Sequence, residues 1–137
     1  MSLADRLLAE PLVAAARRAL DGGEGAWVVG GAVRDAALGR EVADLDLAVA
    51  GDPGPAAKAI AREIGEHAFE LSAEFGTWRV ASAERAWQVD VTVLRAENIA
   101  ADLADRDFTI GAVAVPLGGG DPLDPFGGLA DLERRRL

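Results

Sequence analysis

The sequence contains no cysteine, and histidine and lysine occur once each, as His67 and Lys58. Without cysteine the chain forms neither disulfides nor thiolate metal sites, and a single histidine excludes a zinc site built on several histidines. No apolar run approaches the ~20 residues needed to cross a bilayer, and no basic segment followed by an apolar stretch opens the chain. We therefore expect a cytoplasmic protein that does not span a membrane.

Basic residues are also in short supply, because 14 Lys and Arg stand against 23 Asp and Glu, for a formal net charge of −9. Domains that bind RNA by themselves usually carry a basic surface. Any nucleic-acid partner is therefore expected to be held weakly, by a local patch, or by another domain or chain. The 137 residues, 50% hydrophobic and 27% charged, suit one globular domain.

Hydrophobic periodicity and turn signals divide the chain into helices and strands. Residues 3–20 show an amphipathic helical pattern in which Pro11 predicts a break or a second start. Further helices are expected over residues 32–38, 55–64, 97–103 and 129–136, and strands over residues 26–29, 45–50, 67–71, 77–81, 87–94 and the end of the apolar stretch 108–117. This mixed order predicts an α+β fold with one sheet covered by helices on one side.

A Gly-Gly turn follows the first expected strand, in the segment Val29-Gly30-Gly31-Ala32-Val33-Arg34-Asp35. Glycine lets the backbone approach a ligand, and the N–H groups at a helix start bind anions such as phosphate. Arg34, about one turn into the expected helix, adds a guanidinium. Taken alone, the segment fits an ordinary strand-to-helix turn with a surface arginine equally well or better.

Two acids follow in the next expected strand, within Asp44-Leu45-Asp46-Leu47. Residues two apart on a strand share a face, so both carboxylates project together while Leu45 and Leu47 point into the core. Mg²⁺ relieves the repulsion of such a pair, and it prefers a few carboxylates plus substrate phosphates as ligands. Spacing alone leaves the choice even between a metal site and two solvated acids.

A third acid, Asp90, stands in the apolar run Val89-Asp90-Val91-Thr92-Val93. An acid within such a strand needs a partner or a cation. If this strand neighbours the Asp44–Asp46 strand, three carboxylates converge, and metals held there would activate an attacking hydroxyl and neutralise a triphosphate. Pairing of Asp90 with Arg79 or Arg85 across a hairpin is the alternative.

A charged cluster precedes the last expected strand, in Asp105-Arg106-Asp107-Phe108-Thr109-Ile110. Arg106 is placed to reach a nucleotide while Phe108 and Ile110 pack inside. A helix-ending cluster with local ion pairs explains the same residues.

Together these motifs resemble the head domain of the class II tRNA nucleotidyltransferase (CCA-adding enzyme) and bacterial poly(A) polymerase family. The matching segments, in chain order, are Gly30-Gly31-Ala32-Val33-Arg34-Asp35, Asp44-Leu45-Asp46, Phe75-Gly76-Thr77 with Val89-Asp90-Val91-Thr92-Val93-Leu94-Arg95, Asp102-Leu103 with Arg106-Asp107-Phe108-Thr109-Ile110, and Asp124-Pro125-Phe126-Gly127-Gly128-Leu129-Ala130-Asp131-Leu132. The resemblance covers nearly the whole chain after residue 25, and ordered matches are far more specific than any one of them.

The resemblance implies a polymerase-β-like nucleotidyltransferase fold that transfers NMP from CTP or ATP to the 3′ end of an RNA such as tRNA, with Mg²⁺ as cofactor. The implied catalytic acids are Asp44, Asp46 and Asp90, the first two as magnesium ligands, and the implied nucleotide-binding residues are Gly30, Gly31, Arg34 and Arg106. Residues 1–137 are expected to form one head domain, in which residues 1–24 are the N-terminal helical part.

The sequence departs from the family pattern in three places. Asp105 replaces the first of two arginines, Gly111 replaces an asparagine, and the segment after Arg95 is shorter than usual. The family's neck, body and tail domains, which choose the base and grip the tRNA, have no counterpart here. We therefore expect either a piece of a longer enzyme or a shortened natural relative, which needs further domains to hold RNA.

These departures and the charge of −9 leave two alternatives open. One is a stand-alone, degenerate domain that binds a nucleotide without polymerising RNA. The other is a transferase that moves a nucleotide to a small molecule or a protein, a partner that suits an acidic surface better than tRNA does.

Overall fold

The computed structural model describes residues 3–23, 25–74, 76–84, 86–93 and 114–119. In chain order the described elements are α1 (Leu3–Ala9), α2 (Pro11–Ala19), β1 (Ala26–Val29), α3 (Gly31–Ala37), β2 (Asp44–Val49), α4 (Pro53–Ile64), β3 (Ala68–Ser72), β4 (Thr77–Ala81), β5 (Gln88–Val93) and β6 (Ala114–Pro116). The expected helices over residues 97–103 and 129–136 lie outside this part of the chain.

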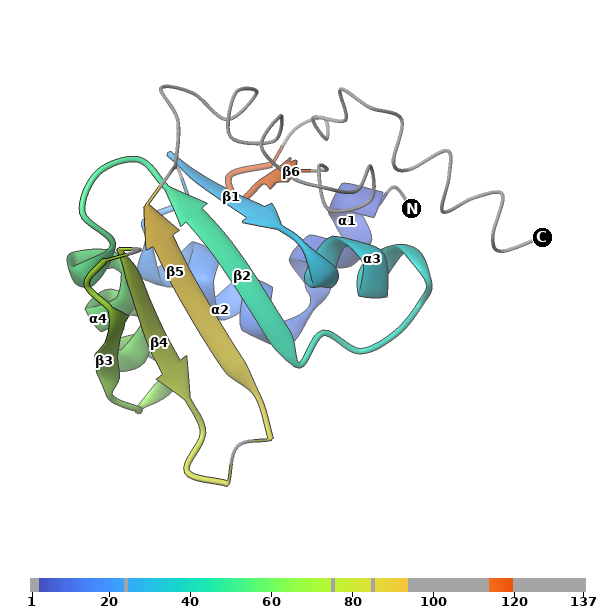
Figure 1. The fold of residues 1–137 in the computed structure, drawn as a ribbon. Helices are drawn as coiled ribbons and strands as arrows, with labels where there is room; N and C mark the ends of the chain where they lie inside the picture. The colour runs from blue at the N-terminus through green and yellow to red at the C-terminus, as the bar shows by residue number, and fades with distance from the viewer. Residues whose placement is uncertain (1–2, 24, 75, 85, 94–113, 120–137) are drawn as a thin grey trace.

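All six strands join in one sheet, in the order β3-β4-β5-β2-β1-β6. The central strands β2 and β5 run parallel (Figure 1), and every other neighbouring pair is antiparallel. The predicted α+β class with one mixed sheet is therefore confirmed. Among the described residues, no helix has the length and apolar character that a bilayer crossing requires.

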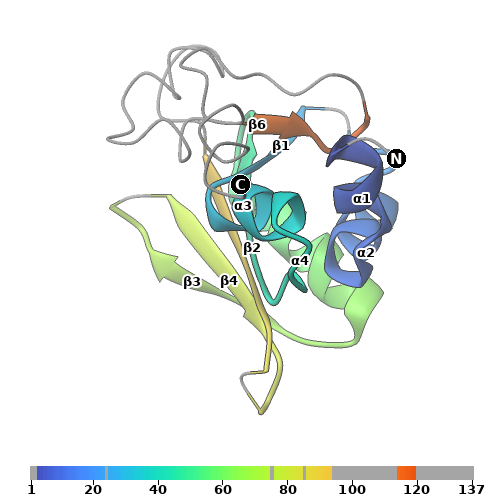
Figure 2. The ribbon, with the colours of Figure 1, turned by 90° about the vertical axis from the view of Figure 1, so that its right-hand side faces the viewer.

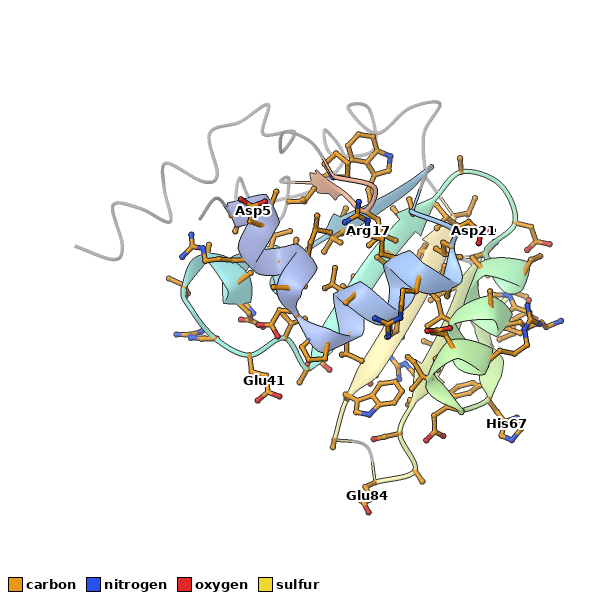
Figure 3. All side chains as sticks on the ribbon, turned by 180° about the vertical axis from the view of Figure 1, so that it is seen from behind. Asp5, Arg17, Asp21, Glu41, His67 and Glu84 are labelled. Atoms are coloured by element: carbon orange, nitrogen blue, oxygen red, sulfur yellow. The ribbon has the colours of Figure 1, made fainter. Side chains whose placement is uncertain are left out.

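Helices α1, α2 and α4 gather on one face of this sheet (Figures 2 and 3). Helix α4 packs against β3, β4 and β5, α2 packs on α4, and α3 contacts β1, β2 and α1. The fully buried side chains between the two layers include Leu7, Val13, Val28, Val33, Leu45, Leu47, Ile60, Val80, Val89, Val91 and Leu117. The prediction that helices cover one side of the sheet is thus confirmed for the described helices.

The N-terminal helical stretch is divided at Pro11, as predicted. Helix α1 ends at Ala9, and α2 begins at Pro11, where the missing N–H of proline removes a donor that has no intrahelical partner. The basic end of α2 then ties the two parts of the helical layer together, because Arg18 Nε donates to Glu63 Oε1 of α4 at 2.8 Å.

The loop between β2 and α4 sets the start of α4. Asp52 is the N-cap, and its Oδ1 accepts from the backbone N–H of Gly54 at 3.0 Å. Pro53 begins the helix with its φ already suited to it. Helix α4 ends at Gly65, whose φ of 87° closes the last turn in the left-handed region.

Candidate nucleotide and metal site

The acid pair lies at the start of β2. The structure begins this strand at Asp44, one residue before the prediction, because the backbone N–H of Gln88 donates to the carbonyl of Ala43 at 2.9 Å and extends the β2–β5 ladder. Asp44 and Asp46 are both exposed, whereas Leu45 and Leu47 are each 1% exposed. The two carboxylates therefore share the face opposite the helices, as the alternation predicted.

The Gly-Gly turn lies directly beside this pair. Val29, the last residue of β1, is the antiparallel partner of Asp46. Gly30 follows with φ 72° and ψ −141°, a conformation that essentially only glycine adopts. A β-carbon on Gly30 would stand 3.2 Å from Oδ2 of Asp46, so the bare backbone of the turn is what lets the carboxylate lie against it.

Arg34 folds back over the beginning of α3. A β-carbon on Gly31 would stand 3.2 Å from Nη2 of Arg34, which places the guanidinium over the second glycine. Its Nε lies 3.5 Å from Oδ1 of Asp35, a loose ion pair, and its side chain is 49% exposed. The cation is thus held at the turn while half of it remains available to an anionic ligand.

Asp90 is brought next to Asp46 by the parallel pairing of β5 with β2, which matches these two residues in register. One row of paired residues crosses the whole sheet and consists of Phe69, Arg79, Asp90, Asp46, Val29 and Ala114. Asp90 therefore lies between an acid on one side and an arginine on the other.

Arg79 holds Asp90 through both carboxylate oxygens. Its Nε donates to Oδ1 at 2.7 Å and its Nη2 donates to Oδ2 at 3.0 Å. This bond to Asp90 raises the pKa of Arg79, against the opposing effect of burial, and the charges of Asp90, Asp46 and Asp44 raise it further. Of the two partners that the hairpin left open for Asp90, the structure shows Arg79; Arg85 lies outside the described residues.

The three acids do not form a three-carboxylate cage. Within the described ranges, no group of three or more His, Cys, Asp and Glu side chains is placed to hold a metal ion. The structure thus meets the condition that β5 neighbours β2 and pairs Asp90 with Asp46 in register, but it engages Asp90 with Arg79, the alternative partner. Arg106, the remaining predicted nucleotide contact, lies outside the described residues, so its role stays a prediction.

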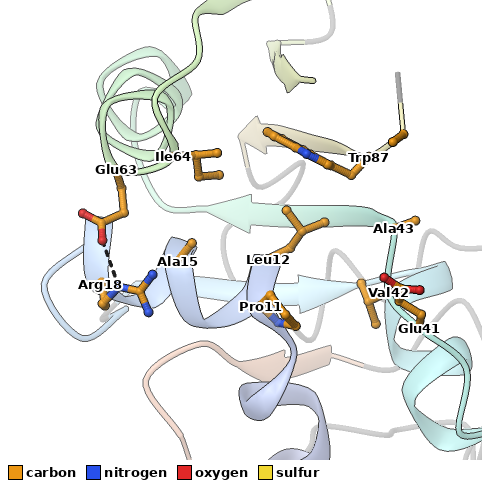
Figure 4. Close-up of a pocket in the computed structure, with 11 residues that line it drawn as sticks. Pro11, Leu12, Ala15, Arg18, Glu41, Val42, Ala43, Glu63, Ile64 and Trp87 are labelled. Atoms are coloured by element: carbon orange, nitrogen blue, oxygen red, sulfur yellow. Dashed lines mark hydrogen bonds and ion pairs between the residues drawn. The ribbon is translucent and has the colours of Figure 1, made fainter. Parts of the chain in front are cut away.

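A groove on the opposite, helical side of the sheet was not predicted (Figure 4). Its volume is about 410 Å³, and its lining combines apolar side chains such as Leu12, Ile64 and Trp87 with the Arg18–Glu63 ion pair. Four separate segments build it, so no local sequence pattern reveals it. Ala43 contributes to its lining, while the next residue, Asp44, projects from the other face.

Comparison with known proteins agrees with this arrangement. Residues 26–137 match the model of the poly A polymerase head domain family. The chain is 47% identical to a CC-adding tRNA nucleotidyltransferase of Geobacter sulfurreducens over 83% of this chain and 26% of the relative. It is 45% identical to an A-adding tRNA nucleotidyltransferase of Deinococcus radiodurans over 82% of this chain and 25% of the relative. The chain thus spans about a quarter of the length of these relatives.

Solved structures show the same fold. A CCA-adding enzyme in complex with CTP matches with a TM-score of 0.80 and 27% identity, over 98% of this chain and 35% of that one. A tRNA nucleotidyltransferase complexed with a primer tRNA and an incoming ATP analog matches with a TM-score of 0.72 and 35% identity, over 87% of this chain and 36% of that one. The predicted resemblance is confirmed, and the chain belongs to the poly(A) polymerase head domain family.

Proposed function

We propose that this chain is the magnesium-dependent catalytic head of a tRNA nucleotidyltransferase, which transfers NMP from CTP or ATP to the 3′ end of an RNA. One observation carries the proposal: the Asp46 carboxylate lies against the bare backbone of Gly30, with Asp44 on the same face of β2. Relatives that add CC or A to tRNA support the choice of reaction.

The donor set suits magnesium. Asp44 and Asp46 offer only carboxylate oxygens, and Mg²⁺ is usually bound by one or two carboxylates together with substrate phosphates. No cysteine is present in the sequence to favour a softer metal. When bound, the ion neutralises charge on the phosphates and makes the attacking hydroxyl more acidic.

The other roles in nucleotide binding and transfer are assigned to residues of this chain. The backbone at Gly30 and Gly31 approaches the triphosphate closely because no side chain intervenes, and Arg34 contributes a half-exposed guanidinium to a phosphate oxygen. Asp44 and Asp46 would hold the ion, which would offset the charge of the α-phosphate during in-line attack. In that step the RNA 3′ hydroxyl loses its proton to water and its oxygen forms a bond to the α-phosphorus. The bond from this phosphorus to the oxygen that bridges to the β-phosphate breaks, and pyrophosphate leaves with the electron pair.

The site is tested by measuring Mg-CTP and Mg-ATP binding to this chain by titration calorimetry. Asp44→Ala and Asp46→Ala are expected to weaken magnesium-dependent nucleotide binding by about tenfold or more, because each removes one of two carboxylate ligands. Asp21→Asn is the control, since it removes one exposed acid from the turn after α2, near the end of β2 opposite to Asp44. Equal binding by wild type and both alanine variants would show that the site is assigned wrongly.

A second candidate, nucleotide binding without RNA polymerisation, is favoured by Asp105 in place of an arginine and by the net charge of −9. The two candidates differ in incorporation of labelled CMP or AMP into tRNA that lacks its 3′ CCA, measured with the full-length natural protein. The proposed function predicts incorporation that Asp44→Ala abolishes. Normal Mg-NTP binding with no incorporation would establish the second candidate instead.

A further inference from the structure

The arginine that engages Asp90 is itself built into the sheet. Arg79 and Asp90 are directly paired across the antiparallel strands β4 and β5, so their backbones fix the distance between them. The two side chains are 28% and 16% exposed, which shields the pair from water. Two parallel N–H···O bonds to one carboxylate are the strongest geometry that such a pair can adopt.

This ion pair lies next to the acids that are proposed to hold magnesium. Asp90 is the register partner of Asp46 across β5 and β2, and neighbouring strands stand about 5 Å apart. The positive charge of Arg79 is therefore close to three carboxylates, one of which it binds directly. A cation that recruits Asp90 as a ligand has to compete with a guanidinium for the same oxygens.

We propose that Arg79 is a positioning residue that withholds Asp90 from the metal ion, so that Asp44 and Asp46 bind it as a pair. This inference rests on the proposed function, and it adds that Arg79 limits the number of carboxylates that bind the ion. A divalent cation with two protein carboxylates keeps coordination positions for a triphosphate, whereas a third carboxylate would occupy one of them. The lack of any three-acid metal group among the described residues agrees with this arrangement.

The consequence of removing Arg79 follows from the same geometry. Arg79→Met keeps much of the apolar stem but removes the charge and both N–H donors that bind Asp90, so Asp90 becomes available beside Asp46. Binding of a divalent cation is then expected to become roughly tenfold tighter, because one cationic neighbour is lost and one carboxylate ligand is gained. Arg79→Lys keeps the charge with a single point of contact and is expected to give a smaller gain.

The experiment uses Mn²⁺ alone as the probe, titrated into this chain, with free Mn²⁺ measured by electron paramagnetic resonance. Wild type, Arg79→Met, Asp90→Asn and the double variant form a thermodynamic cycle. Asp90→Asn is expected to weaken Mn²⁺ binding more in the Arg79→Met background than in the wild type. A charge effect without ligation would be the same in both backgrounds, so the difference between them reports ligation by Asp90.

The chain offers a matched control in Arg18. Arg18→Met removes the same charge from an arginine that donates to Glu63 at 2.8 Å, between α2 and α4 on the helical side of the sheet. Mn²⁺ affinity should stay within about twofold of wild type, because this exposed pair is screened and lies on the helical side of the sheet, opposite the face that carries the acids. Thermal melting followed by circular dichroism checks that each variant is folded.

The outcomes separate this inference from the function on which it rests. Wild-type Mn²⁺ binding that Asp44→Ala does not weaken would overturn the proposed site and this inference together. Asp44-dependent binding that Arg79→Met leaves unchanged or weakens would overturn the inference alone. Arg79→Met could also bind Mn²⁺ more tightly while Asp90→Asn has no larger effect in that background than in the wild type. This result would overturn the inference as well, because Asp90 would then not be the added ligand.

Discussion

The backbone of Gly30 lies so close to Asp46 that a β-carbon on Gly30 would stand 3.2 Å from Oδ2 of that carboxylate. Two independent requirements meet at this glycine. Its φ of 72° with ψ of −141° strains any side chain, and a β-carbon there would also crowd the neighbouring carboxylate, which would have to move by a few tenths of an ångström. Gly30 and Asp46, which are 16 positions apart in the chain, are therefore direct neighbours in the fold.

Gly30→Ala is expected to lower the free energy of unfolding by about 1–3 kcal/mol, the usual range for a side chain forced into such a conformation. Because the new methyl group also pushes against the Asp46 carboxylate, divalent-cation binding should weaken at the same time. Urea unfolding and Mn²⁺ titration of the same preparation measure the two effects.

Gly39→Ala provides the control for this prediction. Gly39 follows α3 with a φ of 73°, but a β-carbon there would meet nothing within 4 Å. Gly39→Ala should lower the free energy of unfolding by about 1–2 kcal/mol, because alanine disfavours the left-handed backbone, and it should leave cation binding unchanged. Equal losses of cation affinity in both variants would mean that the contact between Gly30 and Asp46 is not what matters.

Magnesium should stabilise the wild-type chain through its two acids. A ligand that binds only the folded state at 100 times its Kd adds about 2.7 kcal/mol to the free energy of unfolding. Asp44→Asn should lower this gain to about 1.4 kcal/mol or less at the same magnesium concentration, since binding at least tenfold weaker leaves at most 10 times the Kd. It should not destabilise the chain in the absence of magnesium, because the exposed acid has a like-charged neighbour to repel. Thermal melts with and without Mg²⁺ measure the stability of each variant without the ion and the gain that the ion adds.

Asp21→Asn serves as the control for this measurement. Asp21 is exposed and has a φ of 51°, a conformation that asparagine adopts as readily as aspartate. The Mg²⁺-dependent gain should be unchanged in this variant. An undiminished gain in Asp44→Asn would place the stabilising ion elsewhere.

The core face of β2 carries the stability on which the acids depend. Leu47 is 1% exposed and is paired with Val28 and Val91, both fully buried. Leu47→Ala should lower the free energy of unfolding by about 2–5 kcal/mol, through lost burial and the cavity left behind. Leu71→Ala makes the same chemical change at a position that is 46% exposed and should cost under about 0.5 kcal/mol. Similar losses in urea unfolding would contradict the assigned packing of β2.

Local signals were enough to predict most of the described elements. Alternation of leucine and aspartate placed the acids on the open face of β2, and Pro11 predicted the start of α2. The strand over residues 77–81 was predicted with its observed bounds. In each case the signal lies within a few residues of the feature, because hydrophobic alternation and the missing N–H of proline act locally.

Long-range pairing could not be predicted in the same way. The parallel pairing of β2 with β5 joins strands that are about 40 residues apart. The sequence did not predict this pairing; it indicated only that the three acids would converge if the two strands were neighbours. Arg79 and Arg85 were equal candidates for Asp90 until the register of β4 with β5 placed Arg79 opposite it. One residue of slippage would move Arg79 to the other face of the sheet and so separate it from Asp90.

Arg34 is predicted to serve the nucleotide rather than the metal. Its guanidinium lies over Gly31 and is half exposed, with only a loose contact to Asp35 at 3.5 Å. A hydrogen bond to a charged group is worth about 1.5–3 kcal/mol, so Arg34→Ala should weaken Mg-CTP or Mg-ATP binding by roughly 10- to 100-fold. Mn²⁺ binding without nucleotide should not weaken, because no cation ligand is removed.

Arg40→Ala distinguishes a specific contact from a general loss of positive charge. Arg40 is exposed just beyond the end of the same helix, so the variant changes the net charge by the same amount as Arg34→Ala. Its nucleotide affinity should remain within about twofold of wild type at physiological ionic strength, where exposed charges more than about 8 Å apart are largely screened. Equal weakening by the two variants would reduce Arg34 to a diffuse electrostatic role and leave the turn at Gly30 and Gly31 as the sole proposed phosphate contact among the described residues.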